Sequence, residues 1–416
     1  MVPEQLSAAP APGAAGASAD EAEASPRQTG PGRRRWWQAV PAGLRYSLAV
    51  YALTRVPVVA GTALFLRDHP GSTLESMAVT WDGYWYTHIA RDGYSTSLRA
   101  PVAVVGAAHH TLSDWAFFPG YPLLIRGVAW LTRMPVVPAA IVAAAVLGVL
   151  AVWAVYALGE AHGGVRVARV AALLVAAWPG SAVLGLPYTE GLFLAAAGAA
   201  LVCLQKRRWV VAGLLGAVAS AARPNGLAVV AAAAVVAVLA VLADRDWRAL
   251  LAPALSAAGA AAFVVYGWQR TGDPLVWRHA ENLWQQRLDL NSSAIRGTVR
   301  LLSDLGTTMS SDVGRTDLGT SLLRLLGLLF VAAMVGAAWA NRRRLSLPAA
   351  VYAAVSLAMI LGYSSVGTRP RMVLTVLPGF VWLAAWLPRR VAIALALCLL
   401  PLLGVVAYLW GQDLTP

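Results

Sequence analysis

Residues 227–243 read "LAVVAAAAVVAVLAVLA", an apolar run without one charged side chain. A helix needs roughly 20 apolar residues to cross the hydrocarbon layer of a bilayer. Backbone groups in lipid must be hydrogen-bonded within their own segment, so such a run predicts a membrane-spanning helix. Polar segments bound it on both sides, "ARPNG" at 222–226 and "DRDWR" at 244–248.

Similar runs fill most of the 416-residue chain. The composition is 58% hydrophobic and 13% charged, whereas about a quarter of the residues in a soluble globular protein are charged. We therefore predict an all-α, polytopic helical membrane protein with ten to twelve membrane segments. The apolar runs lie at about 43–66, 116–132, 136–158, 166–184, 187–204, 209–222, 225–243, 249–268, 320–340, 346–363, 371–387 and 391–410.

The net charge of +13 comes mainly from arginines in short loops between these runs. This is the positive-inside pattern of cytoplasmic loops, and no basic groove or soluble module suggests nucleic-acid binding. It predicts a cytoplasmic N-terminus and a plasma-membrane location. The basic segments are "GRRRWW" at 32–37, "QKRRW" at 205–209, "DRDWR" at 244–248, "NRRR" at 341–344 and "PRR" at 388–390.

Two parts follow from this pattern. Residues 1–36, rich in Ala, Pro, Gly, Ser and Glu, predict a disordered cytoplasmic tail, and 37–416 a transmembrane domain. Outer loops are expected at about 67–118 and 269–319, the second with a short helix around 275–289. The short run 116–132, which contains Arg126, is the best candidate for a re-entrant or interfacial segment.

The first outer loop contains "WDGYWYTHIARDGYS" at 81–95. Its aromatic residues would partly desolvate Asp82, and partial burial makes a carboxylate a better general base. The alternative is that Asp82 caps a helix through 83–91. Other candidate binding residues in or after this loop are Trp81, Tyr84, Trp85, His88 and Asp114.

Four further outer positions carry charge. Glu190 in "PYTEG", next to Tyr188, begins an apolar helix, where the helix dipole also favours an acid. Arg223 in "ARPNG" and the pair Arg369 and Arg371 in "TRPR" adjoin helix-breaking prolines. Either arginine group suits a phosphate, because the guanidinium fork binds phosphate bidentately.

Several other chemistries are not indicated. His88, His109, His110 and His279 lack zinc-site spacing, and we predict no metal or cofactor. There is no Gly-rich phosphate loop followed by Lys and no serine-hydrolase elbow. Cys203 and Cys398 lie inside apolar runs and indicate no disulfide.

Taken together, the motifs resemble the PIG-V-like family, the GPI mannosyltransferase II type within the GT-C membrane glycosyltransferases. The resemblance runs from about residue 45 to 385, and composition suggests a GC-rich bacterial genome such as an actinobacterium's. It is carried by "WDGYWYTHIARDGY" at 81–94, "DWAFFPGYPLLIR" at 114–126, "LPYTEGLFL" at 186–194, "KRRWVVAGLLGAVASAARPNGL" at 206–227 and "TRPRMVLTVLPGF" at 368–380.

The resemblance implies a GT-C-type fold and inverting transfer of mannose from a polyprenyl-phosphate mannose donor, with Asp82 as the catalytic carboxylate. Eukaryotic members have a histidine-phenylalanine pair where this chain has Trp85 and Tyr86. The acceptor is accordingly expected to be an envelope glycolipid, a glycan or an exported protein. Transfer of arabinose, glucose or galactose, a lipid-sugar transporter or flippase, and a non-catalytic subunit remain open alternatives.

Overall fold

A computed structural model describes residues 40–99, 112–284, 292–303, 312–362 and 368–411. Throughout these ranges the regular elements are all helices, as the sequence predicts. The protein is an all-α, multi-pass membrane protein. Its helices belong to the unit Ala42–Pro416, and the tail expected at 1–36 lies outside the described residues.

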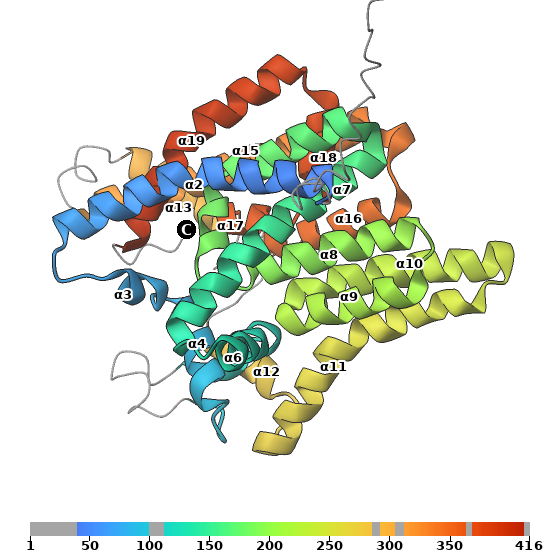
Figure 1. Ribbon diagram of the computed structural model, residues 1–416, viewed down its shortest axis with the longest axis horizontal. Coiled ribbons are helices and arrows are strands. Elements are labelled where there is room, and N and C mark those ends of the chain that lie inside the picture. Colours follow the sequence, from blue (N-terminus) through green and yellow to red (C-terminus); the bar gives the residue numbers. More distant parts are fainter. Residues whose placement is uncertain (1–39, 100–111, 285–291, 304–311, 363–367, 412–416) are drawn as a thin grey trace, which may run out of the picture. The chain divides into compact units, whose positions relative to one another are not determined.

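Many of the helices are joined to the next by only a few residues (Figure 1). In the first half they are α2 (Ala42–Asp68), α3 (Leu74–Ala78), α4 (Asp82–Asp92), η1 (Asp114–Ala116), α6 (Gly120–Thr132), α7 (Val136–Ala177), η2 (Pro179–Gly185), α8 (Glu190–Gln205) and α9 (Trp209–Ala222).

The second half of the chain includes the helix formed by the apolar run 227–243. Its elements are η3 (Pro224–Gly226), α10 (Leu227–Asp244), η4 (Trp247–Leu250), α11 (Leu251–Thr271), α12 (Val276–Leu283), α13 (Ser292–Ser303), α15 (Asp312–Ala340), η5 (Arg342–Arg344), α16 (Leu347–Gly362), α17 (Pro370–Val373), α18 (Leu377–Trp386) and α19 (Arg389–Gly411).

Six helical segments in the described ranges are long and apolar enough to cross a membrane. They are Ala42–Asp68, Val136–Ala177, Pro224–Asp244, Trp247–Thr271, Leu318–Ala340 and Arg389–Gly411. The bent pair η2 and α8 would be a seventh, and α9, α16 and α18 are shorter apolar helices. The lower end of the predicted ten to twelve segments is reached only when these shorter helices are included.

The runs 136–158 and 166–184 were expected as separate segments, and α7 is accordingly two helices joined at a kink between the runs, the second run ending in η2. The helix is broken at Gly163 and Gly164, where Gly164 has φ 72°. Glycine adopts this left-handed backbone region without the steric cost that a Cβ brings. The chain therefore turns through two glycines without an intervening loop.

The run 116–132 begins at Ala116, the last residue of η1, and contains the thirteen-residue α6. At 1.5 Å per residue α6 is about 20 Å long, too short to cross a hydrocarbon layer of about 30 Å. Its Arg126 donates from Nε to the Ala90 carbonyl at 2.9 Å, at the end of α4. The length agrees with the expected re-entrant or interfacial segment, which stays a prediction.

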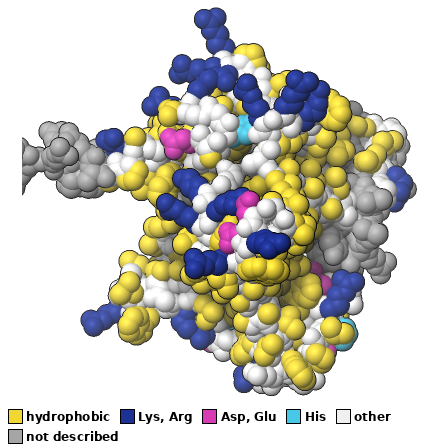
Figure 2. Space-filling model, turned by 90° about the vertical axis from the view of Figure 1, so that its right-hand side faces the viewer, with side chains coloured by type: hydrophobic (Ala, Val, Ile, Leu, Met, Phe, Trp, Pro, Cys, Tyr) yellow, Lys and Arg dark blue, Asp and Glu magenta, His cyan; other side chains and the backbone are white. Residues whose placement is uncertain are grey.

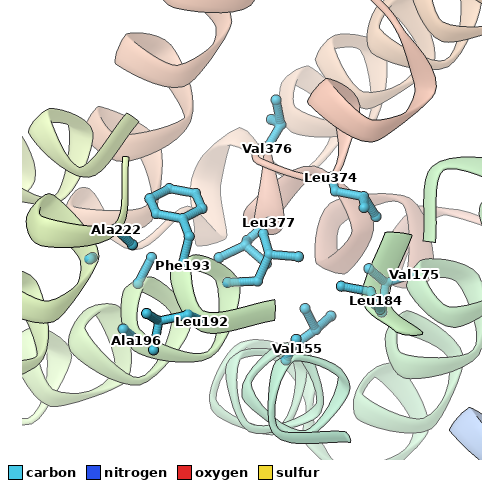
Figure 3. Close-up of a cluster of buried hydrophobic side chains, with 14 of the residues drawn as sticks. Val155, Val175, Leu184, Leu192, Phe193, Ala196, Ala222, Leu374, Val376 and Leu377 are labelled. Carbon is cyan, nitrogen blue, oxygen red and sulfur yellow. The ribbon is translucent and has the colours of Figure 1, made fainter. Parts of the chain in front are cut away.

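The helices pack around α7 and α8. Helix α7 contacts α2, α8 and α18, while α8 and α11 both contact α9, and α10 contacts α16. Figure 3 shows the buried core where these helices meet. Val155 of α7, Phe193 of α8 and Leu377 of α18 point toward one another there.

The loops at the C-terminal end of α8 lie close together. Gln205 donates to the Ser346 hydroxyl at 2.9 Å, and Arg207 pairs with Asp244 at 2.5 Å. Figure 2 shows several groups of Lys and Arg side chains on the side that lies to the right in Figure 1, with few acidic side chains among them. Three of the basic loops expected to be cytoplasmic thus share one end of the bundle.

Candidate active site

Asp82 is the first residue of α4, and Trp81 occupies the cap position before it. The hypothesis that Asp82 caps this helix is therefore wrong, since the cap residue is Trp81 and makes no side-chain cap hydrogen bond. Trp81 has φ 52°, an unfavourable backbone angle for a residue with a Cβ. This strained turn places Asp82 at the start of a helix, where the dipole favours negative charge.

The turn from α3 into α4 is tight. A Cβ at Gly83 would lie 2.1 Å from the Ala78 carbonyl oxygen, so only glycine fits. The hydroxyl of Tyr188 donates to the Thr80 carbonyl at 3.4 Å. The segment before α8 thus supports the turn that carries Asp82.

Arg371 links the half-buried carboxylate of Asp82 to the buried carboxylate of Glu190. Its Nη1 lies 2.5 Å from Asp82 Oδ2 and 3.9 Å from Glu190 Oε1, and its guanidinium lies over the Tyr188 ring. Burial alone would lower the pKa of Arg371, but the charges of Asp82 and Glu190 outweigh burial and raise it above its ordinary value. Arg371 is therefore held as a cation between two anions.

Glu190 begins α8, as expected, and is 1% exposed. Its Oε1 lies 2.8 Å from Arg223 Nη1 in an ion pair, and the Arg223 guanidinium also lies over the Phe193 ring. The four charged residues form an alternating chain in the order Asp82, Arg371, Glu190, Arg223. A buried charge left without its partner is strongly destabilising, so each member depends on its neighbours.

Arg369 and Arg371 flank the start of α17, which has only four residues. The Nε1 group of Trp178 donates to the Pro370 carbonyl at 2.6 Å. A Cβ at Gly180 would lie 2.2 Å from the Pro370 carbonyl oxygen. Helix η2 thus fixes the backbone that carries both arginines.

These elements surround a cavity of about 420 Å³. Of the residues predicted from sequence, Trp81, Asp82, Arg223, Arg369 and Arg371 line it. The two arginine groups that competed for a phosphate in the sequence thus face one space.

The cavity has an excess of basic groups near Arg369. Burial, together with the charges of Arg324 and Arg371, lowers the pKa of Arg369 to about 9, and Asp82 opposes this shift. An anion bound in the cavity would relieve the repulsion among these guanidinium groups.

The remaining predicted residues lie elsewhere. Tyr188 and Glu190 contact Arg371 but do not line the cavity. Trp85 is buried and stacks on Phe117 with ring centroids 5.4 Å apart. These three residues support the cavity wall.

Three further candidates lie on the far side of α4 or beyond it. Tyr84 stacks on His88, and His88 Nδ1 lies 2.9 Å from Asp92 Oδ2. Asp114 is fully buried and accepts from the Ser95 N–H and hydroxyl at 2.7 and 2.8 Å. Burial raises the pKa of Asp114, and the hydrogen bonds from Ser95 oppose this. The contacts indicate that these residues fix the loop.

Sequence reasoning missed part of the cavity wall. Trp277, Glu281 and Trp284 were not identified as candidate site residues. Their spacing of four and then three residues places them on one helix face, which is a readable signal. The cavity is also lined by the apolar side chains of Leu227, Met359, Ile360 and Met372.

The described residues contain no group of three His, Cys, Asp or Glu side chains that could hold a metal ion. His109 and His110 lie outside the described residues.

No protein-family model and no curated protein matches this chain. Among solved structures it is similar to ArnT from Cupriavidus metallidurans bound to undecaprenyl phosphate, with 13% identity and a TM-score of 0.49 over 91% of this chain and 76% of that one. It is also similar to an apo oligosaccharyltransferase from Archaeoglobus fulgidus, with 15% identity and a TM-score of 0.48 over 88% and 55%. Likenesses at this level do not carry an activity from one protein to another.

Proposed function

We propose that this chain is a GT-C-type glycosyltransferase that transfers mannose, with inversion, from polyprenyl-phosphate mannose to an envelope acceptor. The observation that carries the proposal is the cavity where Asp82 meets Arg371, next to Arg369 and Arg223. A carboxylate and several guanidinium groups facing one space provide a base for the acceptor and positive charge for a departing phosphate.

The proposed donor matches both the basic and the apolar parts of the cavity wall. The phosphodiester of a polyprenyl-phosphate sugar carries one negative charge, which suits the basic wall around Arg369 and Arg371. The prenyl chain suits the apolar side chains of Leu227, Met359 and Ile360. A lipid-linked donor also accounts for a site among membrane helices.

The chemistry needs one base and one stabilised leaving group. The acceptor hydroxyl oxygen attacks the anomeric carbon and loses its proton to Asp82. The bond from that carbon to the phosphate oxygen breaks, and the electron pair leaves with polyprenyl phosphate, whose charge Arg369 stabilises. Attack opposite the leaving group inverts the anomeric centre. Arg371 binds Asp82 Oδ2 and so orients the carboxylate.

The proposed location is the outer face of the plasma membrane, with a cytoplasmic N-terminus. Glu190 is the first residue of α8, and Lys206 in a basic loop follows its last residue. The helix is about 24 Å long. Single cysteines at positions 82 and 206, in a chain lacking Cys203 and Cys398, should differ in labelling by an impermeant thiol reagent. Labelling of 206 but not of 82 from outside would invert the orientation.

The decisive experiment supplies labelled polyprenyl-phosphate mannose to proteoliposomes that contain the purified protein and candidate envelope acceptors. Formation of a mannosylated product by wild type, and its loss in Asp82→Asn, supports the proposal. Product from polyprenyl-phosphate arabinose, glucose or galactose alone would change the sugar. Movement of intact donor between leaflets without any product would indicate a flippase.

The same variant distinguishes a non-catalytic subunit from an enzyme. Such a subunit would support product formation by a partner enzyme, and Asp82→Asn would leave that product unchanged. Purified wild-type protein would then form no product alone. Either result would contradict the assignment of Asp82 as the base.

A further inference from the structure

Helix α12 forms a wall of the cavity that is separate from the segments carrying Arg223, Arg369 and Arg371. It packs against η1 and α11, whereas α17 packs against η2 and α15 (Figure 1). Val276 and Ala280 are buried and anchor the helix to the bundle. The two walls therefore come from separate parts of the fold.

Four residues of this segment line the cavity: the exposed Arg278, and three side chains that share one helix face. Trp277 and Glu281 belong to α12, and Trp284 follows directly after it. At 100° per residue the spacing of four and three positions keeps them within an arc of about 60°. Each is half-buried, so each has surface left for a ligand.

The two indoles are held by aromatic neighbours. Trp284 donates from Nε1 to the Ser113 carbonyl at 3.2 Å and meets Phe117 edge to face, with centroids 5.4 Å apart. Trp277 meets Phe118 edge to face at 5.8 Å. Rings fixed in this way bind with a small loss of conformational entropy.

Glu281 stands between the two indoles along the helix. Burial raises its pKa to about 7, while the neighbouring Trp277 indole and the charge of Arg278 oppose the shift. Near neutral pH the carboxyl group therefore exists in both forms and can accept from or donate to a hydroxyl.

The geometry points to a carbohydrate acceptor subsite on α12, in which Trp277 and Trp284 pack against a pyranose ring and Glu281 hydrogen-bonds its hydroxyls. The C–H groups of a pyranose face carry partial positive charge and suit the negative face of an indole. A few placed polar groups then fix the orientation of the ligand. This inference rests on the proposed function only where it identifies the bound sugar as the acceptor. The binding of a sugar does not depend on the proposed function.

The subsite favours a glycan or glycolipid over an exported protein as the acceptor. A peptide would need backbone hydrogen-bond partners or side-chain pockets, whereas this wall offers two indole rings beside one carboxyl group and the guanidinium of Arg278, and both charged groups can hydrogen-bond sugar hydroxyls. Binding of an unglycosylated peptide is therefore the competing outcome of the test.

The test uses full-length protein in lipid nanodiscs and saturation-transfer difference NMR. The probes are methyl α-mannoside, methyl glycosides of glucose and galactose, α-1,6-mannobiose, and an unglycosylated Ser/Thr-rich peptide. The variants are Trp277→Ala and Glu281→Gln. Asn282→Ala is the matched control, because Asn282 is exposed on the same helix and does not line the cavity.

We expect wild type and Asn282→Ala to bind at least one sugar and both test variants to weaken that binding at least tenfold. Kinetics with polyprenyl-phosphate mannose should show a raised KM for the sugar acceptor and a donor KM within twofold of wild type. No sugar binding by wild type, equal loss in Asn282→Ala, or binding of the peptide alone would overturn the subsite. Sugar binding that depends on Trp277 without any transfer would leave the subsite standing and refute the proposed function.

Discussion

Arginine side chains lie in two contrasting environments, one near each end of α8. Arg371 is 10% exposed at its side chain and lies between two carboxylates, whereas Arg207 is 59% exposed and pairs with Asp244 at the surface. Both contacts are 2.5 Å long. Burial, which sequence does not display, separates an arginine of the candidate site from an arginine of a solvated loop.

The largest expected effect is on catalysis. Asp82→Asn keeps the size of the side chain but removes its basicity, so kcat should fall about 10²–10⁴-fold. Asp92→Asn, at the other end of α4, should remain within threefold of wild type. Transfer at a near wild-type rate by purified Asp82→Asn would show that Asp82 is not the base.

Arg371→Met tests the interior of the charged chain. It removes the cation between Asp82 and Glu190, and breaking a buried ion pair from one side typically costs about 3–5 kcal/mol. Thermal unfolding in detergent should show a large loss relative to wild type. A loss no greater than that of Arg207→Met would mean that water already compensates these carboxylates.

Gly180→Ala asks whether η2 positions the arginines. The added Cβ would lie 2.2 Å from the Pro370 carbonyl oxygen and 2.6 Å from the Arg371 nitrogen, so α17 must shift. Overpacking of this kind costs about 1–3 kcal/mol, and activity should fall with it. Gly336→Ala, which meets no atom within 4 Å, is the matched control and should behave as wild type.

Arg369→Lys concerns the donor phosphate. The change keeps a positive charge but removes the guanidinium fork, so we expect the donor KM to rise about tenfold, or about 1.4 kcal/mol, and the acceptor KM to stay unchanged. The measurement is initial-rate kinetics with each substrate varied. An effect confined to Arg223→Lys would move the phosphate to the segment after α9.

The smallest effect is expected at the basic end. Arg207→Met breaks an exposed pair with Asp244, and such pairs typically contribute about 0.2–1 kcal/mol. The apparent melting temperature should change little and transfer kinetics should stay as in wild type. A loss as large as that of Arg371→Met would erase the contrast between the two ends.

Most of the helical architecture was predictable from sequence because apolar runs have their own signal. The run 209–222 corresponds to α9 residue for residue, and 43–66 lies within α2. Local backbone chemistry was harder to predict. Gly163 and Gly164 bend α7 between the two predicted runs without a loop. Asp82 is the first residue of α4, whereas the alternative reading of the sequence made it the cap.

The candidate site was predictable as a set of residue types but not as an arrangement. Asp82, Glu190, Arg223 and Arg371 were identified because charge beside apolar runs is costly and therefore informative. Their separate roles were not visible. Asp114 is an aspartate like Asp82, and His88 is also titratable, yet their contacts hold a loop together.

The sequence by itself determined that this chain crosses a membrane in helices and that its charges concentrate at helix ends, because the cost of charge in hydrocarbon constrains every position locally. Only the tertiary structure decided that Arg371 meets Asp82 across 289 positions and that Gly180 fits against Pro370. Pairings of this kind depend on how helices pack, and packing is a property of surfaces distant in sequence. The same holds for α12, whose two tryptophans and one glutamate gain a shared cavity only through the helices against which they fold.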